Sequence, residues 1–332
     1  MQEVLNEFLA EYKDLPAQRS EQWLLDRKYT IGGSEISTVA NKNPFSSIRD
    51  LVELHIGLKK FNGNINTHWG TVLEDFAIYI FEKKWDCTIY ETGSLHGPIA
   101  FQKYSPDGLT YIKSLDMIIL LEIKNATRRI ANGKIPSMYK PQILTGLNTI
   151  KIANMGMFVD ATFRLCSFAN FTFTAKYDTE IHPNKYIGIP IALCMCCIYA
   201  TEPLTTEPPA EPLTTEPPAE PLPAEYVESV LKAVVDGKLH VFNPGFIVEG
   251  QKNDLMNRFV NRFADAKYKL VVALPLKLFK FETIPVVREK GYIQKYENVI
   301  AETIGNIRQL SELPIDEQTT MLDVMYPRSE SS

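Results

Sequence analysis

A run of five large apolar residues, Met117 to Leu121, leads directly into Glu122-Ile123-Lys124. The run predicts a buried β-strand. Side chains two residues apart share one face of a strand, so Glu122 and Lys124 point together while Ile123 faces the opposite layer. Because a buried charge is costly unless it is paired or coordinates a metal ion, this acid and lysine indicate a polar site at the end of the strand.

A second acid, Asp107 in Ser105-Pro106-Asp107-Gly108, precedes Glu122 by 15 residues. A hairpin that pairs the two segments places Asp107 beside Glu122 and Lys124. Two carboxylates with a lysine form an oxygen site suited to Mg²⁺ or Mn²⁺, with an ammonium available near a water molecule and a phosphate. The alternative is a solvated strand end with an ordinary ion pair, because five other acid-x-Lys triplets occur in the chain.

Two segments nearer the N-terminus carry further candidates. Glu74 lies in the first turns of an expected helix, either as a third carboxylate of a two-metal site or as a charge that stabilises the helix end. Gly32-Gly33-Ser34 opens a short helix, where Ser34 could cap the helix while its hydroxyl and the free amides face an anion. Arg27 could clamp a phosphate, or lie on a solvated helix face.

Gln142 lies in a basic part of the chain. It could orient a water molecule or contact a phosphate, although a single glutamine carries little information. Residues 99–150 contain seven Lys or Arg against three Asp or Glu, although the formal net charge of the whole chain is −5. Arg128, Arg129 and Lys140 could therefore follow a DNA backbone, or form an ordinary basic surface.

The composition favours a globular protein that is not exported. Apolar residues make up 45% and charged residues 23%, unlike a disordered chain or a coiled coil. No apolar run is long enough for a membrane span, and the first residues lack the pattern of a secretory signal. The five cysteines have no paired zinc-ribbon spacing, which argues against a disulfide framework and a structural zinc site.

Helix and strand patterns occur on both sides of a proline-rich repeat. The sequence TTEPPAEPL at 205–213 recurs unchanged at 214–222, which predicts a solvated, extended spacer. Strands before and after it indicate one mixed sheet interrupted by an insertion. We expect a core with the candidate site over 1–199, the spacer over 200–225, the rest of the same domain over 226–312 and a tail over 313–332. The expected helices cover 4–12, 21–29, 35–40, 71–84, 138–150, 226–235 and 290–310, and the expected strands cover 95–109, 111–124, 157–168 and 270–282, the last weakened by Pro275.

Taken in order, these segments resemble the lambda-type exonuclease family, also called YqaJ-like viral recombinases, within the PD-(D/E)xK nuclease superfamily. The resemblance covers residues 16–168 and is strongest to the versions carried by large double-stranded DNA viruses. It implies an α/β (α+β) fold with a restriction-endonuclease-like core, in which a central mixed β-sheet is flanked by helices. The segments that carry it are Arg27, Gly32-Gly33-Ser34, Asn43-Pro44-Phe45, Trp69-Gly70 with Glu74, Ser105-Pro106-Asp107-Gly108, Glu122-Ile123-Lys124 and Ile135-Pro136 through Gln142.

The resemblance also implies a metal centre with two Mg²⁺ or Mn²⁺ ions. Asp107 and Glu122 would hold one ion, with the Ile123 carbonyl, and Glu74 and Asp107 would hold the second. Lys124 would position or activate the attacking water.

The same carry-over assigns the phosphate contacts. Arg27 and Ser34 would grip phosphate at the 5′ end, and Gln142 would assist at the water or the scissile phosphate. Two departures from the family matter. Gly146 stands where many related nucleases carry a tyrosine, which leaves the role of Gln142 open, and the proline-rich repeat leaves ring assembly open.

We therefore expect a Mg²⁺-dependent 5′-to-3′ exonuclease on double-stranded DNA ends, in viral recombination, repair or genome processing. By resemblance, a single-strand annealing protein is the expected partner, a trimer the expected assembly, and the host-cell cytoplasm or nucleus the expected location. The same residues suit a structure-specific endonuclease on junctions, flaps or nicks. A DNA-binding protein without catalysis is a third hypothesis, and the intact Asp107, Glu122 and Lys124 speak against it.

Overall fold

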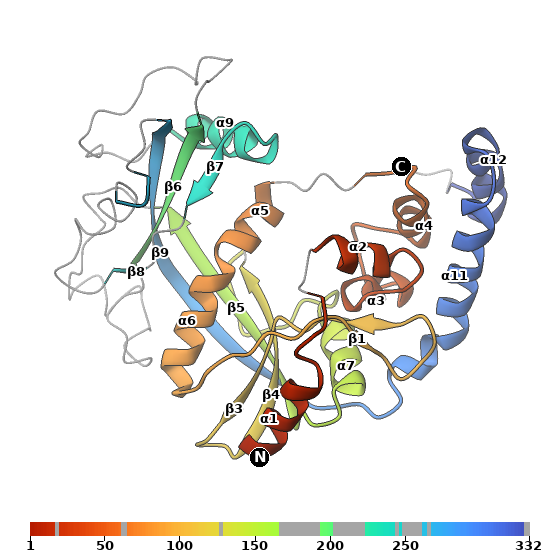
Figure 1. The fold of residues 1–332 in the computed structure, drawn as a ribbon, viewed down its shortest axis with the longest axis horizontal. Helices are drawn as coiled ribbons and strands as arrows, with labels where there is room; N and C mark the ends of the chain where they lie inside the picture. Colours follow the sequence, from red (N-terminus) through yellow and green to blue (C-terminus); the bar gives the residue numbers. More distant parts are fainter. Residues whose placement is uncertain are drawn as a thin grey trace.

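The computed structural model describes residues 1–16, 20–60, 65–125, 129–165, 193–201, 223–242, 246–247, 261–263 and 267–328. Its centre is a seven-stranded sheet built from β3 (Gly108–Ile112), β4 (Met117–Asn125), β5 (Met155–Leu165), β6 (Leu193–Thr201), β7 (His240–Phe242), β8 (Phe246–Ile247) and β9 (Tyr268–Val286). The strand order is β3-β4-β5-β9-β6-β7, with β8 paired to β6 (Figure 1). Only β4 and β5 run parallel among these described pairs. The expected mixed sheet is confirmed, and strands from both sides of the spacer join it.

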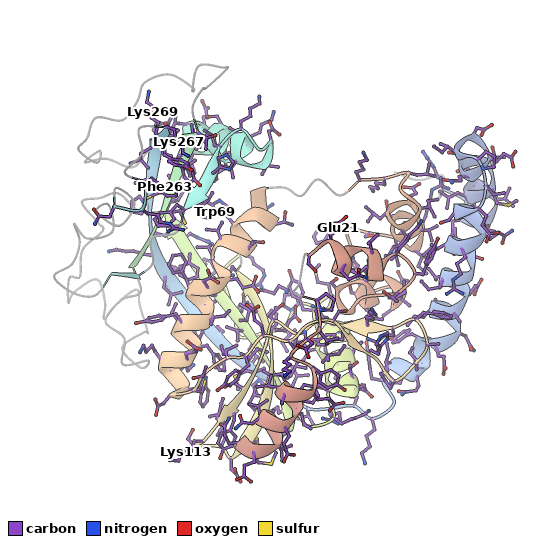
Figure 2. All side chains as sticks on the ribbon, in the orientation of Figure 1. Glu21, Trp69, Lys113, Phe263, Lys267 and Lys269 are labelled. Carbon is purple, nitrogen blue, oxygen red and sulfur yellow. The ribbon has the colours of Figure 1, made fainter. Side chains whose placement is uncertain are left out.

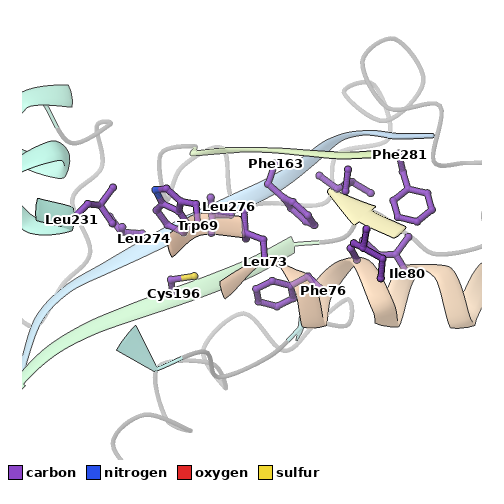
Figure 3. Packing of buried hydrophobic residues seen from close by; sticks show 14 of the residues in the cluster. Trp69, Leu73, Phe76, Ile80, Phe163, Cys196, Leu231, Leu274, Leu276 and Phe281 are labelled. Atoms are coloured by element: carbon purple, nitrogen blue, oxygen red, sulfur yellow. The ribbon is translucent and has the colours of Figure 1, made fainter. Parts of the chain in front are cut away.

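Helices cover both faces of the sheet. One face is covered by α5 (Ile65–Val72), α6 (Glu74–Trp85) and α9 (Ala224–Val235), and the other by α1 (Gln2–Glu11) and α7 (Lys140–Thr149). Figure 3 shows the first of these cores, where Trp69, Leu73 and Phe76 pack against Cys196 and other apolar side chains of the strands. Figure 2 shows side chains filling the space between the strands and their helices. The two buried layers fix β4, and with it the expected site, in the middle of the fold.

A smaller helical layer lies beside the sheet (Figure 1). Its apolar cluster joins α3 (Ile36–Val39) and α4 (Ile48–Ile56) with α11 (Glu297–Ser311) and α12 (Ile315–Met325). The guanidinium of Arg308 lies 4.7 Å from the ring centroid of Phe101 and 5.7 Å from that of Tyr29. These cation–π contacts connect α11 to the loops that border the site. Helix α12 falls within the segment expected as a tail.

Most expected elements are present, and three differ for physical reasons. The strand expected over 95–109 is divided into β1 (Leu95–His96) and β2 (Lys103–Tyr104), because the chain reverses between them and Phe101 adopts a left-handed φ of 59°. The strand expected over 111–124 is interrupted by a turn at 113–116, so residues 111–112 end β3 and β4 begins at Met117, which forms the expected hairpin. The helix expected over 71–84 is two helices that meet at Leu73.

Pro275 does not weaken its strand, contrary to expectation. It lies inside β9 and is aligned with Met195 of β6. On the other side, the pairing of β9 with β5 ends at Leu276 in the described part of the chain. The strand β9 therefore continues through Pro275.

No helix in the described ranges combines the length and apolar character that a membrane crossing requires.

Candidate active site

The β3–β4 hairpin brings Asp107 beside Glu122. Gly108 pairs with Leu121 across the hairpin, so Asp107 comes opposite Glu122. The backbone N–H of Ile123 donates a hydrogen bond of 2.7 Å to Asp107 Oδ2, which fixes the aspartate at the end of β4. Ile123 itself is buried against the α6 face of the sheet. By strand alternation Glu122 faces the α7 side, as the sequence predicts.

Lys124 places its ammonium between the two acids. Its Nζ contacts Glu122 Oε1 and lies 3.5 Å from Asp107 Oδ2. Burial and the charge of Asp107 raise the pKa of Glu122 to about 8, although Lys124 opposes the shift. Burial lowers the pKa of Lys124, but the charges of Asp107 and Glu122 outweigh burial and raise it. The lysine is therefore protonated at neutral pH. Because the pKa of Glu122 is still raised, this one ammonium does not offset burial and the charge of Asp107.

Asp107 and Lys124 open onto a cavity of about 370 Å³ that is lined by residues of 27–43, 94–107 and 138–142. Predicted residues from four distant segments line it: Arg27, Ser34, Asp107, Lys124 and Gln142. Gln142 reaches it from the first turn of α7, where Pro141 is tolerated because no intrahelical N–H is needed there. The other lining residues are Gly32, Gly33, Ser37, Asn43, Ser94, Lys103, Ser105, Met138 and Tyr139.

Arg27 is held at the cavity by Glu35 at the end of η1 (Gly33–Glu35). Arg27 Nη2 lies 3.1 Å from Glu35 Oε1, and Glu35 Oε2 accepts a hydrogen bond of 2.6 Å from Gly32 N. A Cβ on residue 32 would come within 2.9 Å of Arg27 Nη2, so a larger residue there would displace the end of this side chain. Burial would raise the pKa of Glu35, but Arg27 and His55 outweigh it and lower that pKa to about 2. The carboxylate is therefore ionised and orients Arg27.

Ser34 does not cap the following helix, contrary to expectation. It lies inside η1, and its carbonyl accepts a hydrogen bond of 3.2 Å from Ser37 Oγ. The capping role belongs to Glu35, which reaches back to Gly32 N. In a capping box, a glutamate three residues after the N-cap residue accepts a hydrogen bond from the N-cap backbone N–H. Glu35 stands three residues after Gly32, so its role could have been predicted from this spacing.

Two residues that the sequence prediction missed also line the cavity. Lys103 is 7% exposed and is a second lysine facing the same space. The ring of Tyr139 lies 5.6 Å from Lys124 Nζ, a cation–π contact that steadies the ammonium. No local pattern marks either residue, because each reaches the cavity only through the folded arrangement.

Three further predicted residues are described but do not line the cavity, and their roles stay predictions. Glu74 begins α6, on the face opposite Glu122, and its charge contributes to the raised pKa of Glu122. Arg129 forms a two-pronged ion pair with buried Asp160, and Lys140 Nζ lies 3.4 Å from Glu289 Oε1. Arg128 lies outside the described residues.

The oxygen donors at the end of β4 suit one divalent ion. The carboxylates of Asp107 and Glu122 are donors that Mg²⁺ and Mn²⁺ accept, and the expected contribution of the Ile123 carbonyl stays a prediction. Both Glu122 oxygens are buried, and the ammonium of Lys124 contacts Oε1. A divalent ion would add positive charge to that of the ammonium and lower the cost of burying this carboxylate further. The described ranges contain no ready-made cluster of three His, Cys, Asp or Glu side chains, so a second ion with Glu74 stays a prediction.

Residues 22–152 match the family described as the YqaJ-like viral recombinase domain. The matched range includes every candidate site residue, from Arg27 to Gln142. The match agrees with the family resemblance expected from the sequence.

Relatives extend the similarity beyond this domain. The chain is 24% identical over 336 residues to a protein of African swine fever virus from a Malawi tick isolate, covering 92% of this chain and 90% of the relative. The version from a South African tick isolate is 24% identical over 341 residues, covering 94% and 92%. Among solved structures, an alkaline exonuclease from Laribacter hongkongensis aligns with a TM-score of 0.45 at 14% identity, covering 91% of this chain and 100% of that chain.

Proposed function

We propose that this protein is a metal-dependent exonuclease that degrades one strand of double-stranded DNA from the 5′ end. Its setting would be viral DNA recombination, repair or genome processing. One observation carries the proposal: an acidic, lysine-containing centre and an arginine held by Glu35 line the same cavity. A hydrolytic centre beside a phosphate clamp suits a scissile phosphodiester close to a terminal phosphate. The exonuclease name of the Laribacter structure accords with it.

The residues of the acidic centre have separate tasks. Asp107 and Glu122, with the Ile123 carbonyl, would hold a divalent ion, and Glu74 would contribute to a second. When bound, such an ion lowers the pKa of water and polarises the phosphate. Lys124 keeps its proton, so its ammonium would orient the attacking water and offset negative charge that develops on the phosphate.

The residues on the other walls of the cavity would hold the DNA strand. Arg27 offers two parallel N–H donors, a geometry that matches phosphate oxygens. Because Glu35 already orients the guanidinium, little side-chain entropy is lost on binding. Ser34 would add a hydroxyl donor, and Gln142 would hold the water or the scissile phosphate through its amide.

A comparison of linear, nicked and closed circular duplexes tests this function. With Mg²⁺, we expect release of nucleotides from 5′-labelled linear DNA, none with EDTA, and at least about 100-fold slower release with Lys124→Met. Cutting of closed circular DNA would instead favour the endonuclease hypothesis. If the protein bound linear DNA but did not cleave it with any divalent metal ion, the proposed nuclease activity would be wrong.

The proposed recognition of a 5′-phosphate is tested by comparing duplexes that differ only in the chemistry of their 5′ ends. Duplexes with a 5′-phosphate should be degraded faster than duplexes with a 5′-hydroxyl, and Arg27→Ala should abolish that preference. Arg164→Ala is the matched control, because this arginine lies outside the cavity lining and bonds to backbone carbonyls. Equal rates on both ends in the wild type would contradict 5′-phosphate recognition.

A further inference from the structure

Two backbone hydrogen bonds hold Lys103 beside the loop that opens η1. The N–H of Ile31 donates a bond of 2.7 Å to the Phe101 carbonyl, and the N–H of Lys103 donates one of 3.0 Å to the Ile31 carbonyl. These bonds align Ile31 with Gln102 in parallel. Gly32 therefore comes level with Lys103, on the opposite face of the pairing from Ile31.

Contacts on the two faces of this pairing show which way Lys103 points. A Cβ on Gly33 would come within 2.4 Å of the Tyr104 ring, so these two positions share the face that packs into the apolar core. A Cβ on Gly32 would come within 2.9 Å of Arg27 Nη2. Because successive side chains alternate between faces, Lys103 lies on the Gly32 face, which is the face that Arg27 occupies.

The chain after Lys103 supports this direction. Lys103, Ser105 and Asp107 line the cavity, whereas the two described residues between them do not. Contact at every second residue is the pattern of an extended segment that turns one face to a space, so the side chains of these three residues border the cavity. The ammonium of Lys103 therefore shares the cavity with the guanidinium of Arg27.

The charges around the cavity suit a doubly charged phosphate. Among the described lining residues, the cations are Arg27, Lys103 and Lys124, and the acid is Asp107. Lys124 faces the acidic centre, and the charge of Arg27 is shared with Glu35. At neutral pH a terminal phosphate carries about two negative charges, whereas a phosphodiester carries about one. A second cation beside Arg27 therefore favours a chain end over an internal phosphate.

We propose that Lys103 is a specificity-determining residue that supplies the second positive charge for a 5′-terminal phosphate held by Arg27. The inference rests on the proposed function, in which Arg27 grips the 5′ end. The two N–H donors of Arg27 fit a terminal phosphate and a phosphodiester equally well. Lys103 would add most affinity when the phosphate carries its second charge, because the attraction grows with that charge.

Three duplexes that differ only at the 5′ end test this role: a hydroxyl, a methyl phosphate with one charge, and a phosphate with two. Fluorescence anisotropy in EDTA measures the affinity of the full chain without cleavage. The wild type should bind each end more tightly than the one before it. Lys103→Met should lose an about 10-fold preference for the phosphate over the methyl phosphate, the usual effect of removing a charge-assisted hydrogen bond. Arg27→Ala should instead weaken the binding of both phosphate ends.

The matched control is Lys113→Met, in the turn between β3 and β4 at the other end of β3 from Asp107 (Figure 2). It removes the same charge, and the preferences among the three ends should stay those of the wild type. Lys103→Arg keeps the charge and should keep the preference for the phosphate. Melting temperatures and binding of the hydroxyl end, both near wild type in Lys103→Met, would separate recognition from folding.

Different results would contradict the proposed function and the role of Lys103. If the wild type binds the phosphate and hydroxyl ends equally, recognition of a 5′-phosphate in the proposed function is wrong. If the wild type prefers the phosphate to the hydroxyl but not to the methyl phosphate, or if Lys103→Met keeps the full preference, Lys103 does not recognise the second charge. Equal losses in Lys103→Met and Lys113→Met would also overturn the role, since they would indicate a general effect of net charge.

Discussion

Replacing Glu35 by glutamine would remove the charge that joins three groups at the edge of the cavity. Its carboxylate binds Arg27 and His55, each at 3.1 Å, and accepts the N–H of Gly32. Glutamine has nearly the same shape, so the change tests charge with little change in volume. We expect a less stable protein whose Arg27 is no longer held toward the cavity.

The size of the effect follows from the pKa of Glu35. That pKa falls from an ordinary 4.5 to about 2 on folding, and the Glu35 side chain is only 18% exposed. At about 1.4 kcal/mol per pKa unit, the ionised carboxylate contributes about 3 kcal/mol to the free energy of unfolding above pH 4.5. A lowered carboxyl pKa gives stability that is present above the unfolded value and lost as pH falls toward the folded one. At pH 3 about 1 kcal/mol remains.

Urea unfolding followed by circular dichroism at pH 5.5 and pH 3 measures this difference. Glu35→Gln should lower the free energy of unfolding by about 3 kcal/mol at pH 5.5 and by about 1 kcal/mol at pH 3. The control is Glu289→Gln, whose partner Lys140 is 54% exposed, and a surface pair of this kind contributes at most about 1 kcal/mol. A loss in Glu35→Gln that is the same at both pH values would refute the electrostatic argument.

Three further results are expected. Lys124→Met should reduce the cleavage rate of 5′-labelled duplex by at least about 100-fold while circular dichroism shows a folded chain, and near wild-type cleavage would exclude the lysine from catalysis. The two ring nitrogens of His55 face the Lys28 carbonyl and the Glu35 carboxylate. Burial lowers the pKa of His55, but Glu35 outweighs burial and raises it. The stabilising contribution of protonated His55 should therefore be complete below pH 6.5 and should decline as pH rises through the raised pKa. His55→Gln should remove this decline in a pH series of urea melts. Gly33→Ala should cost about 1–3 kcal/mol because of its overlap with Tyr104, whereas Gly70→Ala, whose Cβ meets nothing, should be neutral or stabilising, and equal melting temperatures would contradict the overlap.

The acidic centre could be predicted from the sequence because its geometry is local. One hairpin register sets Asp107 against Glu122, and strand alternation sets Glu122 and Lys124 on one face. The helix with Gln142 could be placed for a similar reason, since Pro141 is tolerated only near its start. These features depend on residues close in sequence, so no knowledge of distant packing is needed.

Features that depend on contacts between distant segments could not be predicted. The apolar spacing continues across α5 and α6, so periodicity alone does not reveal the break at Leu73. Phe101 looks like a strand residue, but it adopts a positive φ where its ring contacts Arg308 of α11. The burial of the Tyr104 ring cannot be predicted from nearby residues, because Gly33 and Gly146 on two other segments leave the space that the ring fills.

The proline-rich repeat is attached to the fold at two ordered elements, and this attachment determines how freely the length of the repeat can change. Strand β6 ends at Thr201, aligned with Tyr268 of β9, and α9 begins at Ala224 and buries its apolar side in the core beside α5. Both attachment points are therefore secured by the body of the protein. Because each doubling of a loop costs only about 0.6 kcal/mol of closure free energy, a change in the number of nonapeptide copies would alter the stability of the fold very little. Repeat length can therefore vary without disturbing the elements that position the candidate site.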